Sequence, residues 1–480
     1  MVPELPRQLY VDGRWEDADS GAVFEVLNPA TGEVLTTVAD GGRSDMARAI
    51  DAAARAQDAW AATPALDRAH IIRGAAQVMR ERIDVMAEIM TLEQGKPLEQ
   101  SRGELLYGID FLDWFAEEGR RAYGMTIPAT TPNKRITVLK QPVGVTAAIT
   151  PWNFPALQIL RKLGAALAAG CTMVVKPAEL TPLSALEVAR CFDMAGLPAG
   201  VHSVVCGLDP AALGDAIMQD PRVRVVSFTG STEVGKLLMR QASETMKRVS
   251  LELGGHAPFI VFDDADLDLA VEQAMASKMR NMGQTCVSAN RIYVQRAVAE
   301  AFTEKLVARM SALQVGNGLD SVDVGPLVEP AAVAKVVRHV DDAVAKGATV
   351  VLGGIRPDSP GYFYVPTVLL DVDESMQVAQ EETFGPVAPV FVFDDEADAV
   401  QRANGTPYGL AAYFFTRDIN RAVRVTERLE FGTVGVNDAM ISAVQAPFGG
   451  MKSSGIGREG GPMGMEEFLE TKYVSLGGVA

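Results

Sequence analysis

The stretch VTAAITPWNFPALQILRKLGAALAAGCTMVVK, residues 145–176, decides the fold class of this chain. Its two ends, 145–149 and 172–176, are short and apolar, which is typical of strands buried inside a sheet. Between them, residues 156–169 have the pattern of a helix that ends at Gly170. A strand, a helix and a strand in this order predict two parallel strands joined by a crossover helix.

Three further helix–strand units extend this pattern toward the C-terminus. We expect helices at 183–195, 210–219 and 233–243, and strands at 203–206, 223–228 and 248–251. Helices that alternate with short apolar strands cover both faces of a parallel sheet. This order is typical of a doubly wound, Rossmann-type nucleotide-binding domain.

A second α/β series occupies the C-terminal half of the chain. Strands are expected at 258–262, 290–295, 387–393, 411–415 and 433–436, with helices between them. The N-terminal region differs, because residues 44–121 predict consecutive helices and residues 8–40 predict short strands and turns. A chain of 480 residues exceeds one ordinary hydrophobic core, so two or more domains are expected.

The composition limits the partners of the protein. Its net charge of −17 opposes binding to nucleic acid or to an acidic membrane surface, because phosphates attract basic faces. An anionic substrate stays compatible, since a few local arginines can bind a carboxylate within an acidic protein. The longest apolar stretches, such as 163–175, are too short to span a bilayer. The first six residues show no signal-peptide pattern, so a cytoplasmic location is expected.

Cysteine and histidine spacing gives no sign of a disulfide framework or a metal site. The cysteines are Cys171, Cys191, Cys206 and Cys286, and no two of them form a C-x-x-C pair. The four histidines are scattered, without the spacing of a zinc site. We therefore expect no metal.

Two glycine-containing segments are candidates for a phosphate site. The string Gly455–Gly460 fits G-x-G-x-x-G, but it follows a Gly- and Ser-rich loop, so a loop is the favoured interpretation. The turn 228–235 instead joins an expected strand to an expected helix. Gly230 can adopt a positive φ there, and free N–H groups at a helix start favour a phosphate. An ordinary turn capped by Ser231 or Thr232 explains the same pattern equally well.

Two residues are candidates for chemistry, although neither is decisive alone. Cys286 lies beside Gly283 between an expected helix and strand, where a thiolate could act as a nucleophile; a buried, inert thiol is the alternative. Glu252 lies at a strand end before two glycines, 34 residues upstream. It could act as a general base, or it could be a solvated carboxylate at a sheet edge.

Taken together, these segments resemble the aldehyde dehydrogenase superfamily over essentially the whole chain. The resemblance rests on ordered motifs with matching spacing: TPWNFP (150–155), KPAE (176–179), the turn 228–235, LELGG (251–255), GQTC (283–286), ETFGP (382–386), PFGG (447–450), KSSG (452–455) and GRE (457–459). It implies an aldehyde dehydrogenase fold, with a Rossmann-type NAD-binding domain, an α/β catalytic domain and a small β oligomerisation element.

The resemblance also implies catalytic roles. Cys286 would attack the aldehyde carbon, and Asn153 with the Cys286 backbone N–H would form the oxyanion hole. Hydride transfer would leave a thioester, which Glu252 would hydrolyse by activating water. Relatives that transfer the acyl group to coenzyme A usually lack this Glu, so a free acid is the expected product.

Coenzyme contacts follow from the same resemblance. Lys176 is expected to bind the adenine ribose, Glu382 the nicotinamide ribose with Phe384 packed nearby, and Gly230 and Ser231 the pyrophosphate; Trp152 and Leu253 complete the predicted site. Glu179 would accept hydrogen bonds from the ribose 2′-OH and repel a 2′-phosphate. This favours NAD, with NADP possible; the alternative is that Glu179 caps a turn or faces solvent.

Within the superfamily, the chain most resembles succinate-semialdehyde dehydrogenases. The matching stretches are TLEQGKP (91–97), WFAEEG (114–119), 147–155, VFDDADLD (261–268) and AAYF (411–414). That group binds the far carboxylate of its substrate with two arginines and a serine, which correspond here to Arg161, Arg280 and Ser442. A guanidinium binds a carboxylate through two parallel hydrogen bonds. Without the resemblance, surface arginines would be the simpler interpretation.

Two departures bear on the substrate and on regulation. Many members of that group have a second cysteine two residues after the nucleophile, but Ser288 stands here, so no disulfide switch is expected. His256 occupies a position where the group often has Asn. A His at this position resembles 2-oxoglutarate-semialdehyde dehydrogenases, which also bind a terminal carboxylate. A short carboxylated aldehyde is therefore expected: succinate semialdehyde first, 2-oxoglutarate or glutarate semialdehyde as alternatives.

The resemblance divides the chain into three parts. Residues 1–124 and 145–251 would bind NAD, residues 252–437 would form the catalytic domain, and residues 125–144 and 438–480 would form the oligomerisation element and tail. The alternating strand near 470–478 would be an exposed edge in a monomer, so a homodimer or homotetramer is expected. Competing hypotheses are a non-catalytic protein, an acyl-CoA-forming enzyme, and a dehydrogenase for betaine, aromatic, long-chain or broader aldehydes.

Overall fold

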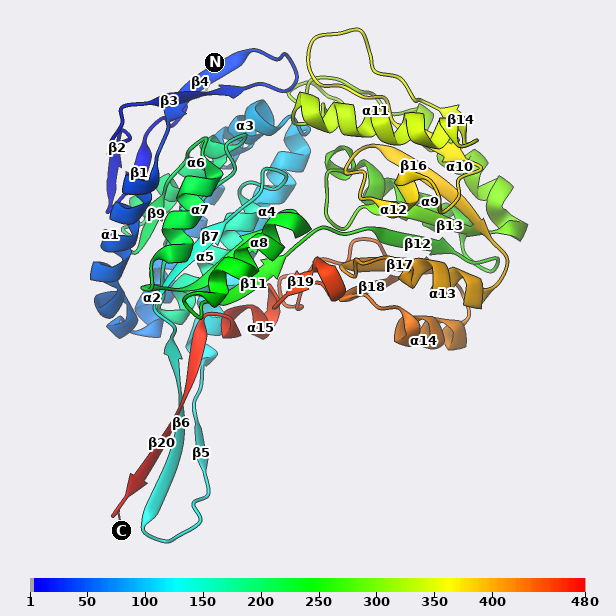
Figure 1. Ribbon diagram of the computed structural model, residues 1–480. Coiled ribbons are helices and arrows are strands. Elements are labelled where there is room, and N and C mark those ends of the chain that lie inside the picture. Colours follow the sequence, from blue (N-terminus) through cyan, green and yellow to red (C-terminus); the bar gives the residue numbers. More distant parts are fainter. Residues whose placement is uncertain (1–3, 480) are drawn as a thin grey trace.

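Two α/β units and a projecting β-arm make up the protein (Figure 1). The structure is a computed structural model and describes residues 4–479. The expectation about a signal peptide rests partly on residues 1–3, which lie outside this range. Within residues 4–479, no helix combines the length and apolar character that crossing a bilayer requires.

The first unit contains the sheet predicted from residues 145–251. Its order is β19-β11-β10-β7-β8-β9-β1-β2, and the five central strands run parallel. The strands are β1 (Leu9–Val11), β2 (Arg14–Glu16), β7 (Val145–Ile149), β8 (Thr172–Lys176), β9 (His202–Val204), β10 (Val223–Thr229), β11 (Arg248–Glu252) and β19 (Gly455–Ile456). The edge strand β19 was not predicted, because two residues give no strand pattern and its partner lies two hundred residues away.

Helices cover both faces of this sheet, as expected for a doubly wound fold. They are α1 (Arg43–Ala62), α2 (Ala65–Glu81), α3 (Ile83–Gln94), α4 (Leu98–Glu118), α5 (Leu157–Ala169), α6 (Pro182–Met194), α7 (Pro210–Gln219) and α8 (Thr232–Ser243). Every residue of α5 is buried, and the helix ends at Gly170 in the left-handed conformation with a φ of 94°. The predicted α/β class is confirmed.

The second unit has a seven-stranded sheet of order β14-β15-β16-β13-β12-β17-β18. Its strands are β12 (Ala257–Val261), β13 (Ala289–Gln295), β14 (Thr349–Leu352), β15 (Thr367–Leu370), β16 (Val387–Phe393), β17 (Ala411–Phe415) and β18 (Thr433–Val436). Its helices are α9 (Leu267–Met279), α10 (Ala299–Ser311), α11 (Pro330–Ala345), α12 (Gln377–Gln380), α13 (Glu396–Asn404) and α14 (Ile419–Arg428). Strands β14 and β15 were not predicted, because each is only four residues long and they flank an irregular loop.

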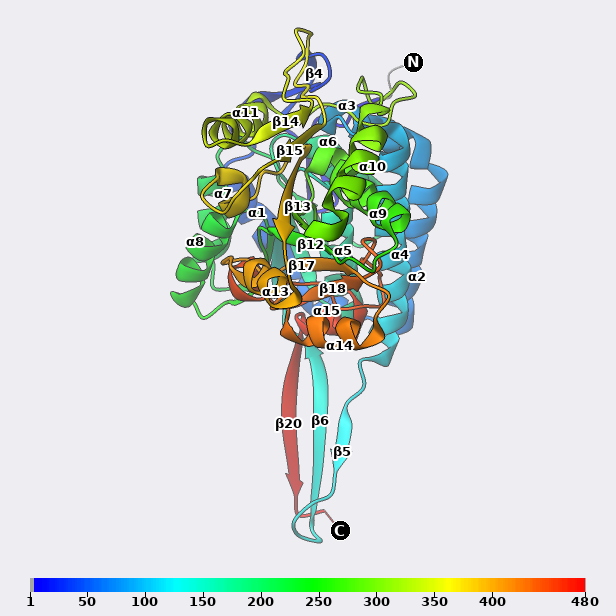
Figure 2. The same cartoon turned by 90° about the vertical axis from the view of Figure 1, so that its right-hand side faces the viewer.

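The β-arm extends away from both units (Figures 1 and 2). Strand β20 (Leu469–Gly477) pairs antiparallel with β6 (Lys134–Pro142) along its whole length, and β6 pairs with β5 (Met125–Ile127). Met125, Tyr473 and Leu476 expose their apolar side chains on this arm. The remaining elements are the hairpin β3 (Val23–Leu27) and β4 (Val34–Ala39), the helix α15 (Gly461–Glu466) and 3₁₀ turns at Gly119–Arg121, Arg280–Gly283, Arg296–Val298 and Lys452–Ser454.

Each large sheet has its own hydrophobic core. The first core contains residues from Leu9 to Leu253, with three residues of the tail, and the second contains residues from Ala257 to Ala439. The short segment 254–256 crosses from one to the other directly after β11. Glu252 therefore lies at the carboxyl end of a parallel strand, where open α/β sheets bind their ligands.

Candidate active site

Cys286 lies in the loop between the 3₁₀ turn Arg280–Gly283 and β13. Asn281, Met282 and Gly283 all have positive φ values, of 49°, 57° and 73°. Two consecutive non-glycine residues in the left-handed region are unusual and mark a turn that tertiary contacts hold in place. This turn presents Cys286 to a cavity, whereas the other three cysteines are fully buried free thiols.

The cavity beside Cys286 has a volume of about 350 Å³ and brings together residues from both units. The predicted residues in its walls are Trp152, Asn153, Gly230, Ser231, Leu253, Cys286, Glu382 and Phe384. Lys335 of α11 also lines it and was missed, since nothing in the sequence distinguishes this lysine from other helix-surface lysines. Residues that are up to 232 positions apart thus meet in one place, as a shared binding site requires.

The Cys286 thiol is protonated in this environment. Burial raises its pKa to about 12, and the nearby Glu382 carboxyl adds to the shift while Arg161 opposes it. Because the thiolate is the nucleophilic form, Cys286 must lose its proton before it can attack. A thiol of this kind reacts slowly until a base or a change in its surroundings removes that proton.

Glu252 ends β11 and is buried, with only 3% of its surface exposed. Among the described residues, neither carboxylate oxygen has a hydrogen-bond partner. Burial and repulsion by Glu459 raise the pKa of Glu252 well above its usual value. The hypothesis of a solvated edge carboxylate is therefore wrong, because β19 pairs with β11 and covers this edge of the sheet.

A buried ion cluster lies next to Glu252. Glu459 accepts hydrogen bonds from Lys162 and from Arg161, whose Nη1 lies 3.0 Å from Glu459 Oε2. Burial alone would raise the pKa of Glu459, but Lys162 and Arg161 outweigh it and hold the pKa below its usual value. Glu459 therefore keeps its negative charge, which adds to the effect of burial in raising the pKa of Glu252.

Asn153 faces Cys286 from the loop between β7 and α5. Its Nδ2 donates to the Gln284 carbonyl at 3.0 Å, and its Oδ1 accepts from the Phe154 N–H. An amide nitrogen has two hydrogens, so one remains for a ligand in the cavity. The position of Asn153 is compatible with the oxyanion role, which stays a prediction.

A second chamber of about 590 Å³ lies behind the nucleophile loop. Arg280 and Ser442 line it together with Tyr107, and the Arg280 guanidinium lies 4.9 Å from the centre of the Phe154 ring. Burial lowers the pKa of Arg280, which nevertheless stays charged at neutral pH because arginine is so basic. Tyr107 was missed because one tyrosine on a helix carries no signal of a binding role.

Arg161 is placed differently from the other two predicted carboxylate ligands. It is buried, stacked between the Phe111 and Phe448 rings and paired with Glu459. It is not among the residues that line the second chamber. Because Glu459 uses only Nη1, the guanidinium keeps other donors, and a role in substrate binding stays a prediction.

The predicted coenzyme residues have distinct surroundings. Lys176 pairs with Glu179 at 3.2 Å, and both lie outside the walls of the cavity beside Cys286. Glu382 accepts a hydrogen bond from the Gly255 N–H, while burial raises its pKa to about 7. Phe384 has a positive φ of 55° and packs edge-to-face on Trp152, with ring centres 5.5 Å apart.

The turn at Gly230 corrects one expectation. Gly230 is not in the positive-φ region. A Cβ at this position would instead lie 2.4 Å from Cζ of the Phe228 ring, so a larger residue would have to displace that ring. Ser231 caps α8 by accepting from the Val234 N–H, and both residues line the cavity. A capped turn and a place at the wall of a binding cavity are thus compatible interpretations of this segment.

Three other sequence features have structural explanations. The string Gly455–Gly460 begins with β19 beside Glu252, as part of a C-terminal loop. Ser288 accepts a hydrogen bond from the buried Lys278, two residues after the nucleophile. His256 bonds the Ala379 carbonyl through Nε2, and neither chamber includes it in its walls. The structure thus shows no direct contact between His256 and either chamber that could distinguish one semialdehyde from another.

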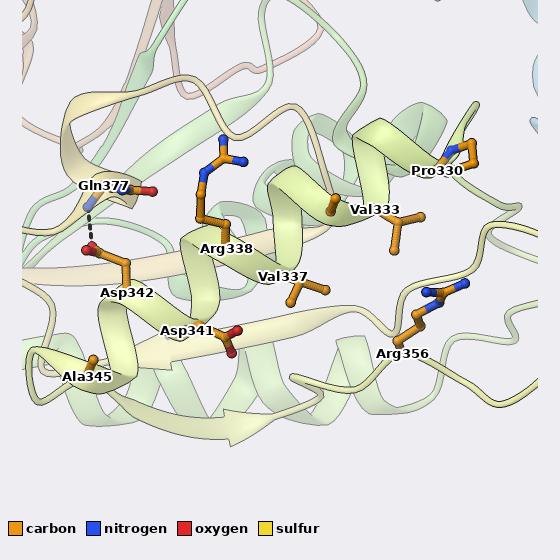
Figure 3. Close-up of a pocket in the computed structure, with 10 residues that line it drawn as sticks. Pro330, Val333, Val337, Arg338, Asp341, Asp342, Ala345, Arg356 and Gln377 are labelled. Carbon is orange, nitrogen blue, oxygen red and sulfur yellow. Dashed lines mark hydrogen bonds between the residues drawn. The ribbon is translucent and has the colours of Figure 1, made fainter.

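A wider depression lies on the outer face of α11 (Figure 3). Its volume is about 710 Å³, and its walls include Arg338, Asp341 and Arg356. Figure 3 also shows Asp342 accepting from the Gln377 N–H, at 2.7 Å. None of the residues predicted for the site lines this depression, so its size alone does not connect it to the chemistry.

Comparison with known proteins identifies the family. The profile of the aldehyde dehydrogenase family matches residues 15–474. The chain is 55% identical to the succinate-semialdehyde dehydrogenase [NADP(+)] GabD of Escherichia coli, over 98% of each chain. It is 54% identical to a glutarate-semialdehyde dehydrogenase of Pseudomonas aeruginosa, again over 98% of each chain.

A solved structure agrees with this match. The chain superposes with a TM-score of 0.96 on betaine aldehyde dehydrogenase of Staphylococcus aureus in complex with NAD+, at 38% identity over 99% of this chain and 98% of that one. The chain belongs to the aldehyde dehydrogenase family. The prediction of an aldehyde-oxidising enzyme is confirmed.

The raised pKa of Cys286 predicts a pH dependence for its alkylation. Below the thiol pKa, the thiolate fraction increases about tenfold per pH unit. We expect the rate of iodoacetamide reaction at Cys286, without coenzyme, to keep rising between pH 8 and about 10.5. The measurement is mass spectrometry of the labelled peptide, with Cys286→Ser as control. A plateau near pH 8 would contradict the raised pKa.

Proposed function

We propose that this enzyme oxidises a short aldehyde with a carboxylate at its far end to the free acid, using NAD(P). The observation that supports this most is the chamber behind Cys286, where Arg280 and Ser442 offer charged and neutral donors together. A guanidinium with a nearby hydroxyl suits a carboxylate better than any neutral group. Succinate semialdehyde is the first candidate, and 2-oxoglutarate and glutarate semialdehyde are the alternatives.

The relatives favour the same chemistry. Two relatives with more than half of their residues identical are named for succinate semialdehyde and glutarate semialdehyde. Both molecules have an aldehyde at one end and a carboxylate at the other, and they differ by one methylene group. A single methylene in a binding pocket changes selectivity only modestly, so the two substrates are expected to compete.

The cavity beside Cys286 fits a dinucleotide coenzyme. Gly230 and Ser231 bring the N-terminus of α8 to its wall, where N–H groups favour a phosphate. Glu382 offers carboxylate oxygens for ribose hydroxyls, and Lys335 adds a positive charge. Bound there, the coenzyme would supply a hydride acceptor. The carboxylate of Glu179 beside Lys176 favours NAD over NADP, as the sequence predicted.

The first half of the reaction is assigned to Cys286 and Asn153. The thiolate attacks the aldehyde carbon, and the oxygen gains negative charge in a tetrahedral thiohemiacetal. The free amide hydrogen of Asn153 and the Cys286 N–H would stabilise that oxygen, an effect often worth about 10²- to 10³-fold in rate. Loss of hydride from the thiohemiacetal leaves a thioester on Cys286.

The second half is assigned to Glu252. As a carboxylate it would take a proton from water, and the resulting hydroxide would attack the thioester carbonyl, break the bond to sulfur and release the free acid and the Cys286 thiolate. Its raised pKa makes it a stronger base, but it must first lose its own proton. Hydrolysis, and not transfer to coenzyme A, is the outcome that this residue favours.

The domain division is part of the same proposal. Residues 1–124 and 145–251 would bind the coenzyme, residues 252–437 would carry the nucleophile, and residues 125–144 and 438–480 would supply the arm and tail. The apolar side chains on the arm support association into a homodimer or homotetramer. We also propose a cytoplasmic location, on the sequence argument given above.

Arg280→Met tests the carboxylate site. We expect kcat/KM for succinate semialdehyde to fall roughly 10- to 100-fold, the cost of a charged hydrogen bond, while propanal changes less than about threefold. Ser442→Ala should give a smaller loss in the same direction. NAD(P)H absorbance reports both substrates. Equal losses for succinate semialdehyde and propanal would remove the carboxylate-specific role.

Glu252→Gln tests the assigned base. We expect a rapid burst of about one NAD(P)H per site, followed by turnover slowed by roughly 10²- to 10⁴-fold as the thioester accumulates. In the unchanged enzyme, a hydrolysis-limited kcat should rise with pH over a range higher than that of an ordinary glutamate, because the raised pKa of Glu252 delays its deprotonation. Stopped-flow absorbance distinguishes the burst from steady turnover. A variant that loses the burst as well would show that Glu252 acts before hydrolysis.

Glu179→Gln tests the coenzyme preference. Removing this carboxylate removes its repulsion of a 2′-phosphate while keeping side-chain size. We expect the ratio of kcat/KM with NAD to that with NADP to fall by about tenfold, mainly through a lower KM for NADP. An unchanged ratio would mean that Glu179 does not contact the ribose. The Glu382→Gln variant serves as control, since it should weaken both coenzymes equally.

A further inference from the structure

The motif TLEQGKP, residues 91–97, is buried throughout, although it contains two charged and two other polar side chains. Lys96 is 1% exposed and Glu93 is 1% exposed. No step of the proposed reaction uses these residues. Burying charges is costly unless hydrogen bonds compensate, so their partners indicate what the segment does.

Lys96 holds the backbone of the predicted oxyanion donor. Its ammonium group donates to the Asn153 carbonyl at 2.7 Å and to Glu104 Oε2 at 2.5 Å. It also lies 4.4 Å from the centre of the ring of Phe154, the residue after Asn153. A single buried cation thus contacts two consecutive residues of the loop that carries the Asn153 amide.

Glu104 continues this contact into the next helix. Its second oxygen accepts from the Ala156 and Leu157 N–H groups, at 3.0 and 3.1 Å, and so caps the start of α5. The Lys96–Glu104 pair therefore bridges the Asn153 carbonyl and the N-terminus of α5. The five residues from Asn153 to Leu157 are fixed at both ends by one ion pair.

Asn281 attaches the nucleophile loop to the same carbonyl. Its Nδ2 donates to the Asn153 carbonyl at 2.9 Å, and its Oδ1 accepts from Gln94 Nε2 at 2.9 Å. Asn281 is also the first of the left-handed residues that lead to Cys286. The Asn153 carbonyl thus receives two donors, one from the first unit and one from the loop that carries Cys286.

We propose that Lys96, with Glu104 and Asn281, is a positioning residue that sets the Asn153 amide relative to Cys286. This inference rests on the proposed function, because it assigns Lys96 an effect only through Asn153. A misplaced donor stabilises the charge on the aldehyde oxygen poorly, even when substrate binding is unchanged. The alternative is that the Lys96–Glu104 pair has a purely structural role. Apolar replacements of buried ion pairs often leave stability unchanged or improved, so the effect on kcat has to be measured separately from stability.

A double-mutant cycle tests the proposal. We expect Lys96→Met to lower kcat by about 10- to 100-fold with little change in KM, and Asn153→Ala to lower it by about 10²- to 10³-fold. In the Asn153→Ala background, Lys96→Met should change kcat less than about twofold, because the donor that it positions is gone. If Lys96→Met alone folds poorly, the variant Lys96→Met/Glu104→Gln replaces it in the cycle. This variant removes both buried charges and should give the same pattern of kcat losses.

Two controls separate positioning from damage to the fold. Glu93→Gln alters a buried glutamate that accepts from the Leu183 and Ser184 N–H groups and caps α6 instead of α5, so its effect on kcat should be small and additive with Asn153→Ala. Iodoacetamide alkylation of Cys286 forms no oxyanion, so Lys96→Met should leave its rate unchanged. Thermal unfolding reports the stability of every variant.

Two outcomes would overturn the proposal. Equal losses of kcat from Lys96→Met in both backgrounds would show that Lys96 acts independently of Asn153, while the proposed function would stand. Full activity in Asn153→Ala would instead remove the oxyanion role of Asn153, and with it the positioning role of Lys96. A kcat loss that disappears with Asn153→Ala supports the proposal.

Discussion

The buried contact of Glu459 with Arg161 and Lys162 is the interaction on which the rest of the site depends. Glu459 comes from the C-terminal loop, whereas both cations lie on α5 in the first unit. Their pairing holds the loop against the first sheet, where β19 covers the edge of β11. That cover excludes Glu252 from water, and the retained charge of Glu459 then disfavours a second charge beside it.

Burial affects the acidic groups around Cys286 and the arginine of the substrate chamber differently. It raises the pKa of Cys286, Glu252 and Glu382, so each of these three groups keeps its proton to a higher pH than usual. On the side of the substrate chamber, Arg280 keeps its charge despite burial, because no ordinary shift reaches neutral pH from so high a pKa. The substrate chamber thus offers a lasting positive charge for a carboxylate, while the acidic groups around Cys286 hold protons that can move.

Local patterns predicted the parallel strands well: β16 and β17 have the expected bounds, because buried strands are short apolar runs between turns. They failed for β19, whose partner is distant, and for β14 and β15, which flank an irregular loop. Cys286 and Glu252 were ambiguous singly and became informative only as parts of ordered motifs. Lys335 and Tyr107, which line the chambers, and Lys96, which contacts the Asn153 backbone, were missed because nothing in their sequence neighbours shows these contacts. The expected positive φ at Gly230 was wrong, and what crowds a side chain at this position is the Phe228 ring.

The place of β19 in the chain has a consequence for synthesis. The first sheet begins with residues near the N-terminus, but its edge strand lies only 25 residues from the C-terminus. Domains commonly fold in order as they leave the ribosome, and unpaired strand edges invite aggregation meanwhile. Here the edge of β11 waits for almost the entire chain to be made. A product truncated before Gly455 would have its nucleophile but an open sheet edge beside Glu252.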